Sequence, residues 1–124
     1  PIAYGLAWPE RMASGASALD FRTLNDLSFE AIDSDGHRAR YPGLALAWEA
    51  LRAAPGSCAV LNAANEVAVA AFLERRLRFD QIHRVNRATL DAWLPEHPDS
   101  LAALMALDGR ARARAELAVK SCAP

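Results

Sequence analysis

The chain is 124 residues long and carries a net charge of −1. This length allows one domain with a modest hydrophobic core and leaves no room for two. The charges are only mildly uneven along the chain, which does not amount to the clustered basic face of a nucleic-acid-binding protein. The longest unbroken apolar run, residues 67–73, is far shorter than the roughly 18 residues of a membrane-spanning helix, and no signal-peptide pattern opens the chain. We therefore expect a soluble, cytoplasmic protein with no nucleic-acid or membrane partner.

The first forty residues are predicted to be a connector with little regular structure. Residues 1–8 are apolar enough for a short helix, which Pro9 would stop. Residues 10–26 mix glycine, serine, aspartate and asparagine with scattered apolar groups, which is typical of an irregular segment. Residues 27–29 alternate apolar and polar groups and predict one short strand, although the chain offers it no partner. Residues 33–40 then read as a turn and a polar lead into the next element.

From residue 41 onward the pattern predicts a helical domain, residues 41–124. Proline at position 42 suits a first helical turn, and apolar residues at helical spacing follow it, namely Leu44, Ala47, Trp48 and Leu51. The expected fold is mainly α, with about four helices joined by short connections, which favours an antiparallel bundle. The first helix is expected from Pro42 to the Pro55-Gly56 pair, and the second from an N-cap at Ser57 to Arg75. The third is expected from a cap at Asp80 to about Trp93. The fourth is expected from a cap at Asp108 to Cys122, after a short apolar turn over residues 100–107.

The helix expected over residues 57–75 is so apolar that other helices must wrap it. Three polar side chains interrupt its apolar surface: Asn62, Asn65 and Glu66 stand at i, i+3 and i+4 and share one patch of the helix. A carboxylate between two amides suits a ligand cluster or a catalytic acid. It also suits a polar network that ties the helix to neighbouring backbone or to another domain. We favour the network because no second carboxylate or histidine stands at a matching spacing.

Cysteine and histidine do not predict a metal site. Cys58 and Cys122 form no CxxC motif and no metal-ligand spacing. They read as buried small hydrophobic residues of a reducing compartment, with an interhelix disulfide left open as an alternative. His37, His83 and His97 lie on three different segments with no carboxylate at ligand spacing.

A series of short motifs spread over nearly the whole chain matches one enzyme family in order and spacing. The most specific is LNAANEVAVAAFL at residues 61–73. The others are PIAY at 1–4, LAWPER at 6–11, SG at 14–15, LDF at 19–21, LSFEA at 27–31, YP at 41–42 and RF at 78–79. Together they resemble the C-terminal part of the 1-deoxy-D-xylulose 5-phosphate reductoisomerase family. One departure is Gly43, where the family commonly has a cysteine after the Tyr-Pro pair.

The resemblance implies an enzyme of the non-mevalonate isoprenoid pathway. Members of the family use NADPH and a divalent metal, Mg or Mn, to isomerise and reduce the sugar phosphate to 2-C-methyl-D-erythritol 4-phosphate. They consist of an N-terminal dinucleotide-binding domain, a central catalytic and dimerisation domain, and a C-terminal helical bundle. The missing N-terminal and catalytic domains are therefore the expected partners of this chain.

The family's catalytic groups have no counterpart in these residues. Its cofactor-binding turn, its acidic metal ligands, the groups that hold the substrate phosphate and its mobile active-site loop belong upstream of the stretch that residue 1 opens. We therefore predict no catalytic, cofactor-binding or metal-binding residue here, and no activity for the 124 residues alone. Glu66 is not carried over as a metal ligand, because the family's metal acids lie in a different motif.

Two functions stay open at this point. The first is a structural C-terminal domain that supports the catalytic domain of the enzyme. The second is a free-standing helical interaction module without enzymatic activity. In either case residues 1–40 hold too many large apolar groups for a free tail. We expect them to pair with a second copy, which would give a homodimer, or to be mobile and protease-sensitive while the bundle folds by itself.

Overall fold

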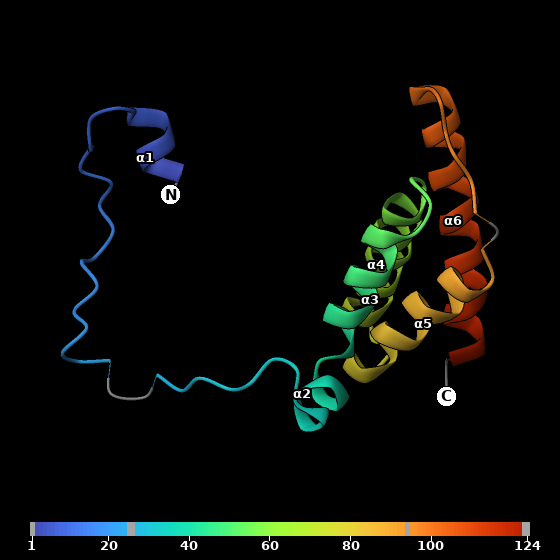
Figure 1. Cartoon of the computed structure of the whole chain (residues 1–124), viewed down its shortest axis with the longest axis horizontal. Helices are drawn as coiled ribbons and strands as arrows, with labels where there is room; N and C mark the ends of the chain where they lie inside the picture. Colours follow the sequence, from blue (N-terminus) through green and yellow to red (C-terminus); the bar gives the residue numbers. More distant parts are fainter. Residues whose placement is uncertain (1, 25–26, 94, 123–124) are drawn as a thin grey trace. The chain divides into compact units, whose positions relative to one another are not determined.

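The computed structural model of the chain describes residues 2–24, 27–93 and 95–122, and every regular element within them is a helix (Figure 1). The chain divides into two units, residues 1–30 and residues 31–124. The first unit holds α1 and an irregular segment. The second unit holds the remaining helices. The helices are α1 (Ile2–Ala7), α2 (Asp35–Arg40), α3 (Pro42–Arg52), α4 (Ser57–Leu73), α5 (Phe79–Asp91) and α6 (Leu101–Cys122).

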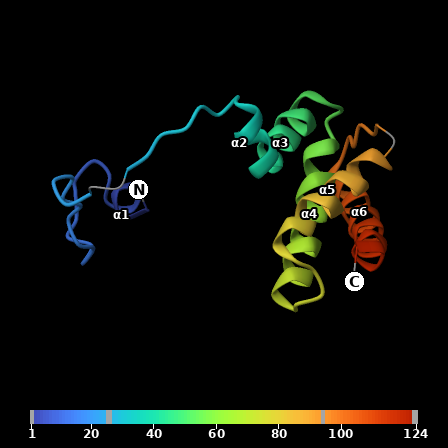
Figure 2. The ribbon, with the colours of Figure 1, turned by 90° about the horizontal axis from the view of Figure 1, so that it is seen from below.

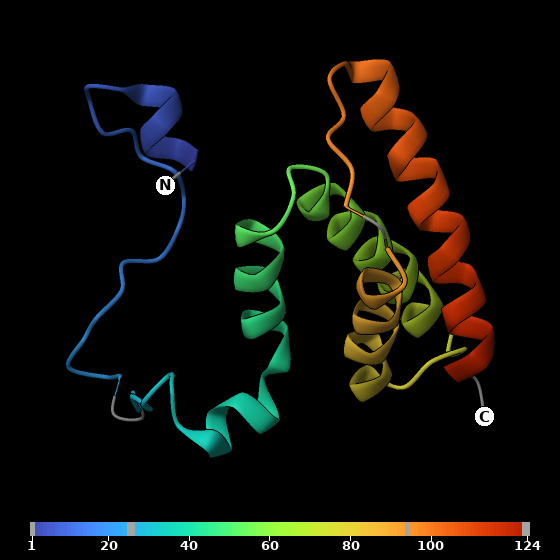
Figure 3. The same ribbon diagram turned by 45° about the vertical axis from the view of Figure 1, so that its right-hand side comes forward.

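The bundle of the second unit is built around α4. Helices α4, α5 and α6 all contact one another, and α3 packs on α4 and α5. Successive helices alternate in direction, so that α3 and α5 run against α4 and α6 (Figure 3). The same grouping is visible from below (Figure 2). This arrangement agrees with the mainly α fold and helical bundle that the sequence predicts.

Alanine lets α4 and α6 approach closely, because a methyl side chain occupies little space between two helix axes. Ala64 and Ala68 of α4 and Ala111 and Ala115 of α6 are completely buried. Larger side chains fill the remaining space around these alanines, and this close packing defines the core. The larger buried residues of the bundle are Leu46, Val60, Val67, Leu77, Val85, Leu107 and Val119.

Three helix starts differ from those that the sequence predicts. The N-cap of α4 is Gly56, and Ser57 is the first helical residue. Asp80 lies inside the first turn of α5, whose N-cap is Arg78. Asp108 lies in the middle of α6, because the apolar stretch before it continues the same helix. At the start of α6 the hydroxyl of Ser100 takes the capping role and accepts a hydrogen bond from the N–H of Ala103 at 3.2 Å.

The region before the bundle also differs in two places. The strand expected over residues 27–29 is absent from the described structure, where these residues are irregular. A strand needs a neighbour to satisfy its backbone, and no described segment supplies one. The turn and polar lead expected over residues 33–40 are instead a short helix, α2. Ser34 starts α2 by accepting a hydrogen bond from the N–H of His37 at 3.2 Å.

Helix α3 buries a different face from the one that its apolar spacing suggests. Its buried residues are Leu46 and Ala50, which lie against the rest of the bundle. Leu44, Trp48 and Leu51, the largest members of the predicted stripe, are 40%, 50% and 64% exposed. The helix is apolar on two sides, and within the described structure only the side with the smaller residues is covered.

Candidate functional site

The three polar residues of α4 lie on its exposed surface and bond in two different directions. Asn62 Nδ2 donates to Glu66 Oε1 at 3.1 Å, and Glu66 Oε2 accepts from Arg112 of α6 at 2.6 Å. Asn65 bonds instead to α5, where its Oδ1 accepts from Asn86 Nδ2 at 3.1 Å. The patch therefore tethers α4 to both of its neighbours, Asn62 and Glu66 on the α6 side and Asn65 on the α5 side.

Arg112 is the centre of the contacts on the α6 side. Its Nη2 bonds to Glu66, and its Nε donates to Asp108 Oδ2 at 2.7 Å, one helical turn earlier in α6. Hydrogen bonds to Asp108 and then to Glu66 raise the pKa of Arg112, so it remains a cation. The sequence pattern does not single out Arg112 and places Asp108 at a helix start. The i, i+4 spacing of this pair was the signal that one continuous helix contained both.

The same contacts give Glu66 the properties of a structural ion-pair partner. The pKa of Glu66 is lowered, first by its hydrogen bond from Arg112 and then by the one from Asn62. A general acid or base works best with a pKa near the operating pH, which for a carboxyl requires a raised value. A divalent metal would have to compete with a guanidinium 2.6 Å away. Glu66 therefore does not fit an acid-base or metal-binding role, and the described residues contain no cluster of three potential metal ligands.

A cavity of about 510 Å³ lies beside Asn65, on the α5 side of the polar patch. Asn65, Asn86 and His83 contribute to its wall, together with Phe79 and Tyr41. Asn86 is only 7% exposed, and its Oδ1 has no hydrogen-bond partner in the structure. Partial burial and then the positive charge of Arg87 lower the pKa of His83, so its neutral form is favoured. The cavity wall thus combines amides, a neutral imidazole and aromatic rings.

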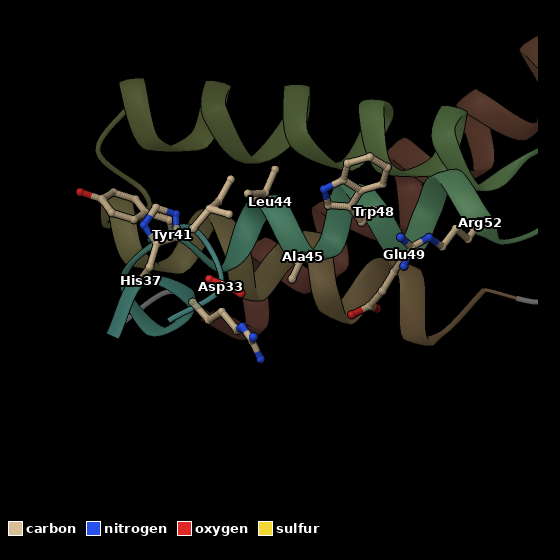
Figure 4. A pocket seen from close by; sticks show the side chains of 10 residues that line it. Asp33, His37, Tyr41, Leu44, Ala45, Trp48, Glu49 and Arg52 are labelled. Carbon is tan, nitrogen blue, oxygen red and sulfur yellow. The ribbon is translucent and has the colours of Figure 1, made fainter. Parts of the chain in front are cut away.

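A second exposed feature runs along the outside of α3. We call Tyr41, Leu44, Trp48 and Leu51 the outer row. Figure 4 shows Tyr41, Leu44 and Trp48 following one another along the helix, on the wall of an open groove of about 540 Å³. All four members of the row are at least 40% exposed. The sequence revealed the apolar spacing of most of this row but not that it faces outward.

Cys58 and Cys122 are both free; Cys122 is half-buried, whereas Cys58 is exposed and not buried as expected. Cys58 lies in the first turn of α4 on a side that the other helices leave uncovered.

None of the helices in the described part of the chain is long and apolar enough to cross a membrane.

Comparison with known proteins identifies the family. The family described as DXP reductoisomerase C-terminal domain matches residues 1–114 of this chain. The chain belongs to this family. The match confirms the resemblance based on the motif at residues 61–73 and extends it through most of α6.

Full-length reductoisomerases show the same relationship over part of their length. The enzyme from Ralstonia nicotianae is 52% identical over 116 residues, which cover 94% of this chain and 28% of that protein. The enzyme from Zymomonas mobilis is 42% identical over 121 residues, which cover 98% of this chain and 30% of that protein. The chain therefore spans roughly 30% of the length of these relatives.

Solved structures agree with the sequence comparison. A structure of the Zymomonas mobilis reductoisomerase in complex with NADPH matches with a TM-score of 0.78 and 42% identity, over 97% of this chain and 31% of that one. A DOX-P reductoisomerase in complex with magnesium matches with a TM-score of 0.75 and 32% identity, over 99% of this chain and 32% of that one. The helical fold of this chain is thus the fold of the corresponding part of these enzymes.

Proposed function

We propose that this chain is the C-terminal structural domain of a cytoplasmic 1-deoxy-D-xylulose 5-phosphate reductoisomerase. The observation that carries the proposal is the family match over residues 1–114. In the proposed enzyme NADPH and a divalent metal, Mg or Mn, are held by domains outside these residues. Those N-terminal and catalytic domains are the partners of the bundle, and the bundle supplies a rigid support without taking part in the chemistry.

The polar contacts of α4 support a structural role for the bundle. Glu66 is fixed by Arg112, and Asn65 is fixed by Asn86, so both side chains connect helices of the bundle. Side chains engaged in this way stabilise the relative positions of α4, α5 and α6. They are poorly placed to exchange protons or ligands with a substrate, because each such exchange would break a contact between helices.

A chimera tests this proposal directly. The chain would replace the matching C-terminal 28% of the Ralstonia nicotianae reductoisomerase, and NADPH oxidation would be measured with 1-deoxy-D-xylulose 5-phosphate and Mg²⁺. We expect the chimera to be active and the 124-residue chain alone to show no substrate-dependent loss of NADPH absorbance. A folded but inactive chimera would contradict the proposal, and so would turnover by the chain alone.

The alternative function is a free-standing helical interaction module. The exposed outer row supports this alternative as much as the first function, because an apolar row of this kind requires a partner whatever the partner is. The chimera separates the two functions. A module that had diverged to bind an unrelated protein would not restore the activity of a reductoisomerase whose own C-terminal domain had been removed.

A further inference from the structure

The spacing of the outer row is that of a helix seam. Tyr41, Leu44, Trp48 and Leu51 are separated by three, four and three residues. This is the alternation of a and d positions through which one helix packs into the surface of another. The buried residues of the same helix, Leu46 and Ala50, lie on a different side. Helix α3 therefore has one seam that the bundle fills and a second seam that is open in the described structure.

The composition of the open seam is that of a protein interface. Two of its four members are aromatic, and tryptophan and tyrosine are enriched among the residues that dominate binding energy. The guanidinium of Arg52 lies 5.2 Å from the ring centre of Trp48, and that of Arg40 lies 5.4 Å from the ring centre of Tyr41. Arginine thus flanks the seam at both ends, and a complementary surface would carry a carboxylate at the Arg52 end.

We propose that the outer row is the surface through which the bundle docks on the rest of the reductoisomerase. The inference rests on the proposed function and names the contact surface within it. The occupant is an apolar surface of the enzyme outside these 124 residues, with an acidic side chain placed to meet Arg52. Trp48 and Leu44 insert at the centre of this contact, and Arg52 pairs with a carboxylate at its end.

Charge argues against a second copy of the chain as the occupant. In an antiparallel pairing of two outer rows, Tyr41 faces Leu51 of the other copy, and the flanking Arg40 faces Arg52. In a parallel pairing Arg52 faces Arg52. Arg40 then also faces Arg40, so in either arrangement two guanidinium groups meet at each end of the seam, and like charges across an interface disfavour association.

The size of the row also favours a partner within one polypeptide. A stable complex between separate proteins buries about 800 Å² on each partner, which is more than four side chains of one helix provide. Interfaces between domains of one chain are stable at smaller sizes, because the linker keeps the two surfaces at a high effective concentration. A narrow row of four residues is therefore better suited to interdomain docking than to dimerisation.

Cysteine footprinting tests this surface. Leu44→Cys probes the row, and Ala113→Cys on the exposed side of α6, between two arginines, is the matched control. Both variants are made in a background of Cys58→Ser and Cys122→Ser, in the free chain and in the chimera with the Ralstonia nicotianae enzyme. Iodoacetamide modification at each position is followed by peptide mass spectrometry. We expect position 44 to react readily in the free chain and at least about tenfold more slowly in the chimera, with position 113 equally reactive in both.

The outcomes separate the inference from the proposed function. Equal modification of position 44 in the free chain and in an active chimera would overturn the docking surface and leave the proposed function intact. Protection of position 44 in the free chain that grows with protein concentration would assign the row to a second copy and overturn the inference. An inactive chimera would overturn the proposed function and the inference with it.

A second variant measures the contribution of the row independently of labelling. Trp48 is 50% exposed in the bundle, so Trp48→Glu should lower the melting temperature of the free chain less than that of the chimera. In the chimera the same change places a carboxylate in the apolar contact and should lower the melting temperature. An equal effect in both proteins would mean that Trp48 acts only within the bundle and would contradict the docking surface.

Discussion

Arg112 of α6 lies 2.6 Å from Glu66 of α4 and 2.7 Å from Asp108 in the preceding turn of its own helix. One guanidinium therefore joins the two helices that form the alanine-rich centre of the bundle. Because alanine offers little side-chain surface, the core alone gives α4 and α6 few features that fix their sliding along one another. The contact with Glu66 fixes this register at the edge of the core, and the contact with Asp108 holds the guanidinium in place.

Acidification should reveal the contribution of Glu66. Its folded pKa is lowered from the ordinary value of 4.5 by hydrogen bonds from Arg112 and Asn62. A lowered carboxyl pKa stabilises the fold at pH values above 4.5, and this stabilisation is lost as the pH falls through the folded pKa. Glu66→Gln should therefore melt below the wild type at neutral pH and together with it once the pH has fallen below the folded pKa of Glu66. Thermal melts at a series of pH values measure this difference.

Asp99→Asn is the control for this pH series, because Asp99 is an exposed carboxylate on the loop before α6. Its substitution should change the melting temperature little at any pH. The effect of Glu66→Gln should also shrink at high salt, since the pair is exposed and therefore screened. A constant difference between Glu66→Gln and the wild type at all pH values would refute the ion-pair explanation.

Asp108 shows why the sequence predicts α6 only in part. The residue follows a short apolar stretch, and aspartate before an apolar helical pattern usually marks a helix start. The structure instead places Asp108 one turn before Arg112 in a continuous helix. The local sequence contains both the capping signal at Asp108 and the i, i+4 pairing signal of Asp108 with Arg112. Only the contact between Arg112 and Glu66 on a distant helix favours the pairing, and with it the continuous helix.

Helix α4 is the opposite case, because its position could be predicted from residues 57–75 alone. A helix that is apolar on most of its surface has no stable place except the centre of a bundle. For α3 the same reasoning predicted the helix but not its orientation. Its apolar residues lie on two sides, and the choice between Leu46 and Trp48 for burial depends on the shape of the neighbouring helices, which spacing does not encode.

Gly56 occupies a position that no larger residue fits. A Cβ at this position would lie 2.8 Å from Leu107 Cδ2 and 3.1 Å from the carbonyl oxygen of Glu96. The N–H of Gly56 donates to that same carbonyl at 3.3 Å, so the two backbones must stay close. Gly56→Ala should lower the free energy of unfolding by about 1–3 kcal/mol because of this overpacking. Urea denaturation followed by circular dichroism measures the change.

The matched control is Gly109→Ala in α6, where a Cβ meets nothing within 4 Å. Alanine at a helix-interior position should stabilise the chain by about 0.5–1 kcal/mol relative to glycine. The two glycine-to-alanine changes should therefore have opposite signs. Stabilisation by both would show that the loop containing Glu96 moves away from α4 without cost.

Gln81 connects the start of α5 to the end of α6. Its Oε1 accepts from the N–H of Arg78 at 2.7 Å, and its Nε2 donates to the carbonyl oxygen of Cys122. The residue is only 8% exposed, so its substitution leaves polar backbone groups in a largely dry site. Gln81→Ala should lower the free energy of unfolding by about 1–3 kcal/mol, measured by urea denaturation.

Gln81→Glu separates the two hydrogen bonds, because a carboxylate keeps the acceptor for Arg78 and removes the donor to Cys122. Amide hydrogen exchange should then become faster in the last turn of α6 and stay slow at the start of α5. Equally fast exchange at both sites would mean that the link to Cys122 does not determine the stability of the end of α6.

In the described part of residues 2–34 no residue is buried, although Trp8, Phe21 and Phe29 are large and apolar. The only helix there is α1, and the residues after it have no hydrogen-bonded partner strand. We expect limited trypsin digestion to cleave after Arg11 and Arg22 well before any site inside α5 or α6, since proteases require a locally unfolded substrate.

Mass spectrometry of the digest would identify these cuts, and light scattering of the intact chain would measure its oligomeric state. A monomer with early cuts indicates a mobile segment. A dimer with protection of Arg11 and Arg22 that is lost on dilution indicates that exposed apolar residues of two copies cover one another. A monomer whose first forty residues resist trypsin as well as α5 and α6 do would contradict the prediction, because apolar side chains that are exposed in this structure would then have found cover within a single chain.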